Sequence, residues 1–180
     1  MNRIKGLLYK SCGATMSTTV LVILNPAKDE TLKAAENARK VEDPLYRVRA
    51  NFWLTYSEIR LNRLGDGEKL VRENLAFLES HPKEVDNYLT SRMSFAEAEL
   101  FAAKKNWALS NEKYRLCLQS DPMTDVIWEP MVRIRFGEAL ANQGLKAEAR
   151  EQYTQAARIY EKIGNKTHAQ IVQKLLNALG

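Results

Sequence analysis

The stretch that decides the fold is Val132–Tyr160, which reads VRIRFGEALANQGLKAEAREQYTQAARIY. On both sides of Gly144 its apolar residues recur every three or four positions, which is the spacing of an amphipathic helix. A glycine between two such stretches is typical of a tight turn. Gly137 and Ala149 are small residues that would let the two helices approach closely. The stretch therefore predicts an antiparallel pair of helices.

The same pattern recurs upstream at steps of about forty residues. Three positions of the second helix align in the three copies: Leu70, Asn74 and Phe77, then Ser110, Tyr114 and Cys117, and then Ala149, Tyr153 and Ala156. In the first helices the small residue is Ala98 or Gly137, and in the first copy either Ser57 or Glu58 takes this position, with Ser57 preferred. We expect repeats over 44–82, 84–122 and 125–163.

These residues resemble the tetratricopeptide repeat, in which small residues let two helices nest, an aromatic residue fills the gap and a proline ends the second helix. Pro82 and Pro122 stand at that last position. The resemblance covers about residues 29–180 and implies an all-α fold, a right-handed superhelix of about three antiparallel hairpins. The spacing exceeds the thirty-four residues of the family, and the long arms are similar to repeat modules of bacterial signalling ATPases, cyclases and transcriptional regulators.

Helical spacing, caps and turn residues predict the individual elements. Asp43 and Pro44 suit the start of a helix, and Gly65-Asp66-Gly67 suits the turn that follows it. Pro130 lies either in the first turn of a short helix or at a kink in a longer one. The predicted helices are 29–41, 44–64, 68–80, 84–104, 107–119, 125–143, 145–163 and 166–178.

The two ends of the repeat array differ. Residues 29–41 read as a half-hairpin whose apolar face needs a cover, either residues 1–28 or another copy or subunit. Residues 166–178 read as a capping helix with a polar outer face. Ala169, Val172, Leu176 and Leu179 are expected to face inward, and Lys166, Gln170, Gln173 and Lys174 to face water.

The charge distribution argues against a nucleic-acid-binding body. Residues 1–28 hold four of the five net positive charges and no acid, which leaves the other 152 residues at +1. We expect residues 1–28 to be a flexible tail or a degenerate repeat; organelle targeting is the alternative. The apolar run Val20–Leu24 is too short to span a bilayer, so we expect no membrane association.

No catalytic motif is visible in the sequence. Cys12 and Cys117 form no CxxC pair, and Cys117 is expected to be a reduced core thiol, which indicates a cytoplasmic protein. His81 and His168 lack a second ligand at metal-binding spacing. The sequence also lacks the phosphate-binding and nucleophile motifs of common enzymes. We therefore expect a non-enzyme without cofactor or metal.

The resemblance implies a binding site for a protein or peptide partner on the concave surface, which is formed by the first helices. The residues that would line it are Phe52, Thr55, Ile59, Arg92, Phe95, Glu99, Met131, Ile134 and Glu138. This stripe is either a groove for an apolar partner segment or hairpin core that never meets solvent. The tryptophans Trp53, Trp107 and Trp128 are expected to pack in the core rather than to stack on bases.

Two functions follow. The first is a protein–protein interaction scaffold or adaptor, which binds a partner segment through the concave surface. The alternative is a regulatory or sensor domain of a signalling or transcription protein, which binds a small ligand or nucleic acid.

Overall fold

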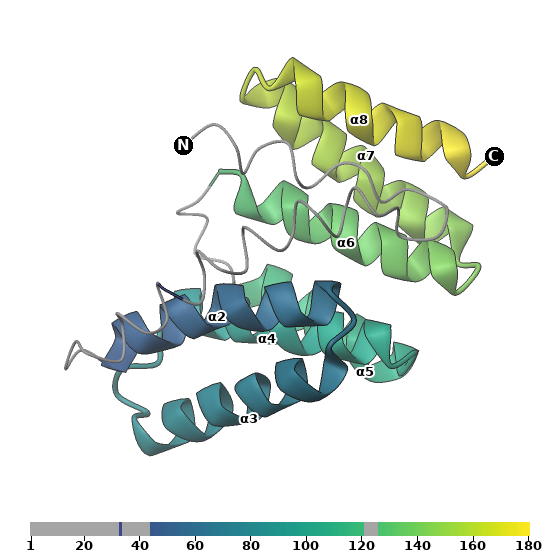
Figure 1. Ribbon diagram of the computed structural model, residues 1–180. Coiled ribbons are helices and arrows are strands. Elements are labelled where there is room, and N and C mark those ends of the chain that lie inside the picture. The colour runs from purple at the N-terminus through teal and green to yellow at the C-terminus, as the bar shows by residue number, and fades with distance from the viewer. Residues whose placement is uncertain (1–32, 34–43, 121–125) are drawn as a thin grey trace. The chain divides into compact units, whose positions relative to one another are not determined.

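The computed structural model describes residues 33, 44–120 and 126–180. In these residues the helical periodicity of the sequence gives seven helices (Figure 1). No strand occurs among these residues, so the all-α prediction is confirmed for them. The half-hairpin at 29–41 and the segment 1–28 lie outside the described residues, apart from the helical Lys33. The chain divides into two compact units, Met1–Val85 and Asp86–Gly180, which are treated separately below.

The first unit contains one described hairpin, α2 (Pro44–Arg60) packed against α3 (Leu64–Ser80). Pro44 occupies the first helical position, as predicted, because it lacks only an N–H that would be unpaired there. The prediction of a break at 65–67 was wrong. Both glycines belong to α3, and the turn lies at residues 61–63, where Asn62 adopts a positive φ of 60°.

The second unit contains α4 (Asn87–Ala103), α5 (Trp107–Ser120), α6 (Trp128–Asn142), α7 (Lys146–Lys162) and α8 (Lys166–Ala178). Neighbouring helices along the chain pack against each other, with α6 against α5 and α7, and α7 against α8 (Figure 1). Pro130 lies in the first turn of α6, which decides between its two predicted positions. The predicted inward and outward faces of α8 are confirmed, since all four inward residues are buried and all four outward residues are exposed.

One turn geometry joins the helices of each hairpin. The central turn residue has a positive φ at Asn62, Lys105 and Gly144, and again between α7 and α8 at Gly164. In each case the next residue donates its N–H to a carbonyl five residues back, as in Leu145 N–H to Leu140 O at 3.0 Å. This pairing satisfies carbonyls that the helix end would otherwise leave unpaired.

Counting from the central turn residue aligns the three hairpins. The positions five, nine and twelve residues later are buried in every second helix: Gly67, Val71 and Asn74, then Ser110, Tyr114 and Cys117, and then Ala149, Tyr153 and Ala156. The position seven residues earlier is also small and buried in every first helix, as Thr55, Ala98 or Gly137. In the second helix of the first hairpin, the aligned positions therefore lie three residues earlier than the predicted Leu70, Asn74 and Phe77.

Close approach explains the small residues. A side-chain carbon added at Gly137 would lie 2.5 Å from the Tyr153 ring, and one added at Gly67 would lie 2.7 Å from Ile59. Ser110 donates a hydrogen bond of 3.0 Å from its hydroxyl to the Ala98 carbonyl. Thr55, and not the expected Ser57 or its alternative Glu58, holds the equivalent position in α2 and is fully buried.

Candidate partner-binding surface

The first helices place most of the nine predicted partner-binding side chains in the interior. Phe52, Thr55 and Ile59 are buried on α2, and the Thr55 hydroxyl donates to the Asn51 carbonyl over 2.8 Å. When the hairpins are aligned on their turns, the α2 residues equivalent to the predicted residues of the other two hairpins are Arg49, Phe52 and Tyr56. The predicted α2 set is therefore shifted by three residues, with Phe52 alone common to both sets.

On α4 all three predicted residues are buried. The Arg92 guanidinium carbon lies 3.3 Å from the centre of the Trp128 ring and 4.4 Å from that of Tyr88. Phe95 packs edge-on against Trp128 at 5.1 Å between ring centres. A cation held on an aromatic face is stabilised by the negative charge of the ring face. These contacts make this part of α4 hairpin core.

On α6 the burial is less complete. Ile134 is buried, whereas Met131 and Glu138 are half-buried and reach solvent. These two residues are therefore the members of the predicted set that a partner could touch without rearrangement of the second unit.

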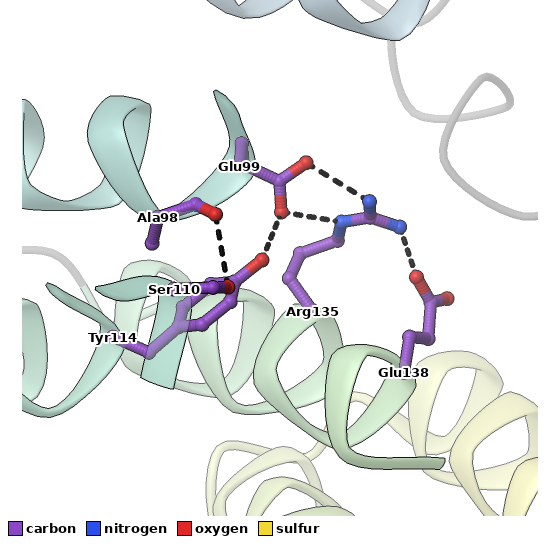
Figure 2. Close-up of polar contacts among 6 residues, drawn as sticks. All are labelled: Ala98, Glu99, Ser110, Tyr114, Arg135 and Glu138. Atoms are coloured by element: carbon purple, nitrogen blue, oxygen red, sulfur yellow. Dashed lines mark hydrogen bonds and ion pairs between the residues drawn. The ribbon is translucent and has the colours of Figure 1, made fainter. Parts of the chain in front are cut away.

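A buried polar cluster joins α4, α5 and α6 (Figure 2). The Arg135 guanidinium donates to both carboxylate oxygens of Glu99, over 3.0 Å from Nε and 2.9 Å from an Nη atom. The Tyr114 hydroxyl donates to the same carboxylate over 2.5 Å, and Arg135 also pairs with Glu138 one turn further along α6. The Glu99 carboxylate thus accepts three hydrogen bonds from two neighbouring helices.

The electrostatics of this cluster follow from its burial. The side chain of Glu99 is 2% exposed and that of Arg135 is 15% exposed. Burial, and next the Glu99 charge, raise the pKa of Tyr114 well above its usual value, so the phenol stays protonated and remains a donor. Since the Glu99 carboxylate is fully engaged by fixed donors, the arrangement is suited to holding three helices together rather than to moving a proton.

Two further polar contacts link the second and third hairpins. Asn111 on α5 and Gln143 at the end of α6 exchange a reciprocal pair of amide hydrogen bonds at 2.9 and 3.1 Å. The Trp128 indole donates to the Ser91 hydroxyl, which in turn donates to the Cys117 carbonyl, both over 3.0 Å. Cys117 is fully buried, as predicted from its small-residue position.

Sequence reasoning omitted three informative residues from the site. Arg135 and Tyr114 complete the Glu99 cluster, and their helical spacing alone does not show that they meet. Trp53 is the third: it is 46% exposed, so the prediction that it packs in the core was wrong, whereas Trp128 is 2% exposed and fits it. The helical spacing of Val48, Phe52, Tyr56 and Ile59 could have indicated this, because at 100° per residue Trp53 lies about 100° from the centre of their shared face.

Comparisons with known proteins add no relative: no protein-family model matches the chain, and no curated protein is significantly similar to it. Within the described ranges, no group of three or more histidine, cysteine or acidic residues is placed to hold a metal ion. No helix in those ranges combines the length and apolar character needed to cross a bilayer.

Proposed function

We propose that this chain is a tetratricopeptide-like interaction scaffold, which holds a segment of a partner protein against the first helices of its hairpins. The observation that carries the proposal is the shared register of the hairpins. Residues at fixed distances from the same kind of turn are buried in three consecutive copies, with Val71, Tyr114 or Tyr153 between two smaller residues in each second helix. Repeat proteins whose hairpins stack on one another form extended surfaces for partner segments.

The hydrogen bonds that join three helices of the second unit support the same proposal. Glu99, Tyr114 and Arg135 join three helices through three charge-assisted hydrogen bonds to the Glu99 carboxylate. A surface whose helices are already fixed loses less conformational entropy when a partner binds, and this raises affinity. The half-buried Met131 and Glu138 lie on α6, which is the first helix of the third hairpin, and we assign the partner contact to them.

A site-specific crosslinking experiment tests the proposal. A photo-reactive amino acid replaces Met131 in one variant and the exposed Lys174 of the capping helix α8 in the other. We expect a partner to be crosslinked from position 131 and not from position 174. We also expect Met131→Glu to abolish its recovery in a pull-down, whereas Lys174→Glu retains it. Equal labelling from both positions, or no labelling from either, contradicts the proposal.

A further inference from the structure

Burial separates the side chains of α2 into two sets. The described residues at 48, 51, 52, 54, 55, 56, 58 and 59 are buried, whereas Arg49, Trp53, Ser57 and Arg60 reach solvent at least in part. Trp53 is the most unusual of these, because 46% of a large aromatic side chain remains accessible. Exposed tryptophan and arginine are the residue types that most often dominate binding at protein interfaces.

Helix geometry brings three of these residues onto one line. At about 100° per residue, Arg49, Trp53 and Arg60 lie within a sector of roughly 40°. The rise of the helix separates the two arginines by about 16 Å along its axis, with Trp53 between them. We call these three residues the Arg–Trp stripe. Its central ring is held edge-on by two buried neighbours, Phe52 at 5.0 Å and Tyr56 at 6.4 Å between ring centres.

The stripe carries two positive charges and no acidic residue. The nearest acid on α2, Glu58, is buried and lies 3.8 Å from Arg63 in the following turn, so its charge is directed away from the stripe. Arg49 and Arg60 also interact within the chain. A guanidinium has five N–H donors, so an internal contact leaves donors for a second carboxylate.

We propose that the Arg–Trp stripe binds an acidic amphipathic helix of a partner protein. One apolar side chain of that helix packs on Trp53, and carboxylates about three turns apart pair with Arg49 and Arg60. Charge complementarity sets the sign of the partner, since both ends of the stripe are basic. Arginine pairs with carboxylates through two parallel hydrogen bonds, which adds geometric selectivity.

A protein helix fits the stripe better than a nucleic acid does. Single strands bind to successive aromatic rings that lie along a basic groove. Here a single exposed ring, that of Trp53, stands on the described part of α2, and residues 29–180 carry a net charge of only +1. The proposal goes beyond the scaffold function, because the stripe and the assigned contacts Met131 and Glu138 lie in different compact units, and because Trp53 and Arg60 align with none of the predicted residues.

A selection experiment on the full-length protein tests the stripe. The probe is a phage-displayed library of amphipathic helical peptides of about twenty residues, with random residues on one face. The library is selected against the wild-type chain, against Arg49→Glu/Arg60→Glu, and against Trp53→Ser. The matched control is Arg72→Glu/Arg158→Glu, which makes the same change in net charge at two exposed positions elsewhere. Far-UV circular dichroism and urea midpoints establish that each variant is folded, and Arg49→Gln/Arg60→Gln replaces the charge-reversed variant if that one unfolds.

The wild type and the control should enrich peptides with Asp or Glu on both sides of an apolar residue. The charge-reversed variant should enrich Lys and Arg at those positions instead, or lose the acidic preference if the glutamine variant is used. The best acidic peptide should bind Trp53→Ser at least about tenfold more weakly than wild type, and its affinity should fall as salt is raised. The proposal is overturned if all variants select peptides of the same charge. It is also overturned if the control variant loses the acidic preference as much as the charge-reversed variant does. So does an oligo-dT strand that binds more tightly than the best peptide and is lost in Trp53→Ser.

Discussion

Replacing Arg135 by methionine gives the most direct test of what the buried cluster contributes. The change removes two of the three hydrogen bonds to the Glu99 carboxylate and leaves the Tyr114 hydroxyl as the remaining donor to it in the cluster. Methionine retains much of the apolar stem of arginine, so the loss is electrostatic rather than a cavity. Removing one partner of a buried ion pair costs about 3–5 kcal/mol, because the other charge remains in a poorly solvated site.

Arg133 provides a matched control on the same helix. Its side chain is 17% exposed, close to the 15% of Arg135, and it also pairs with a glutamate. That partner, Glu129, is 21% exposed, whereas Glu99 is 2% exposed. Water can therefore solvate Glu129 once the arginine is gone, and Arg133→Met should cost only about 0–1 kcal/mol.

Urea unfolding at neutral pH, followed by circular dichroism, measures both free energies of unfolding. A third variant, Glu99→Gln with Arg135→Met, removes the orphaned charge and should recover most of the stability lost in Arg135→Met. The reasoning is refuted if Arg135→Met destabilises the chain no more than Arg133→Met does. It is equally refuted if the double variant is as unstable as the single one.

Three other predictions concern the turn, the close approach and the buried phenol. Gly65→Ala, which meets nothing within 4 Å, should stabilise α3 by about 0.5–1 kcal/mol. Gly137→Ala should instead destabilise by about 1 kcal/mol, since a clash of about 1–3 kcal/mol outweighs the same gain in helix propensity; urea midpoints that rise for both variants would contradict this. Lys105→Gly should raise stability by about 0.5–1 kcal/mol, because φ is 57° there and glycine adopts this conformation without strain; Lys105→Ala, as control, should not. Because the raised pKa of Tyr114 keeps it neutral while the unfolded chain ionises, native stability should fall as pH rises above about 10. Tyr114→Phe should lack this fall, so the stability gap between it and wild type should shrink by up to about 1.4 kcal/mol per pH unit, measured in matched urea titrations.

Much of the helical architecture could be predicted from spacing and turn residues. The predicted 166–178 helix agrees with α8, and its inward and outward faces are the observed ones, because a helix with one apolar face is stable when that face packs against its neighbour. The turn between α2 and α3 could not be predicted in the same way. Asn62 and Gly65 both tolerate a positive φ, and choosing between them depends on packing of Gly67 against Ile59, which no local pattern reveals.

The site was less predictable than the fold. Phe95 and Glu99 were correctly assigned to a first helix, but neither the burial of Glu99 nor its partners on two other helices follows from sequence spacing. Trp53 illustrates the reverse case. An apolar residue next to buried Phe52 was expected to be core, and the 100° turn of the helix places it outside.

The common turn has a consequence for how such a chain can vary in length. Asn62 and Lys105 lie 43 residues apart and Lys105 and Gly144 lie 39 apart, yet the buried positions keep their distance from each of them. Extra residues at the helix ends that lie far from the turn therefore leave the buried positions in register. A single residue inserted between the turn and Tyr153 would rotate the rest of α7 by about 100° and expose its apolar side. Natural insertions and deletions should accumulate accordingly in the segments that connect one hairpin to the next.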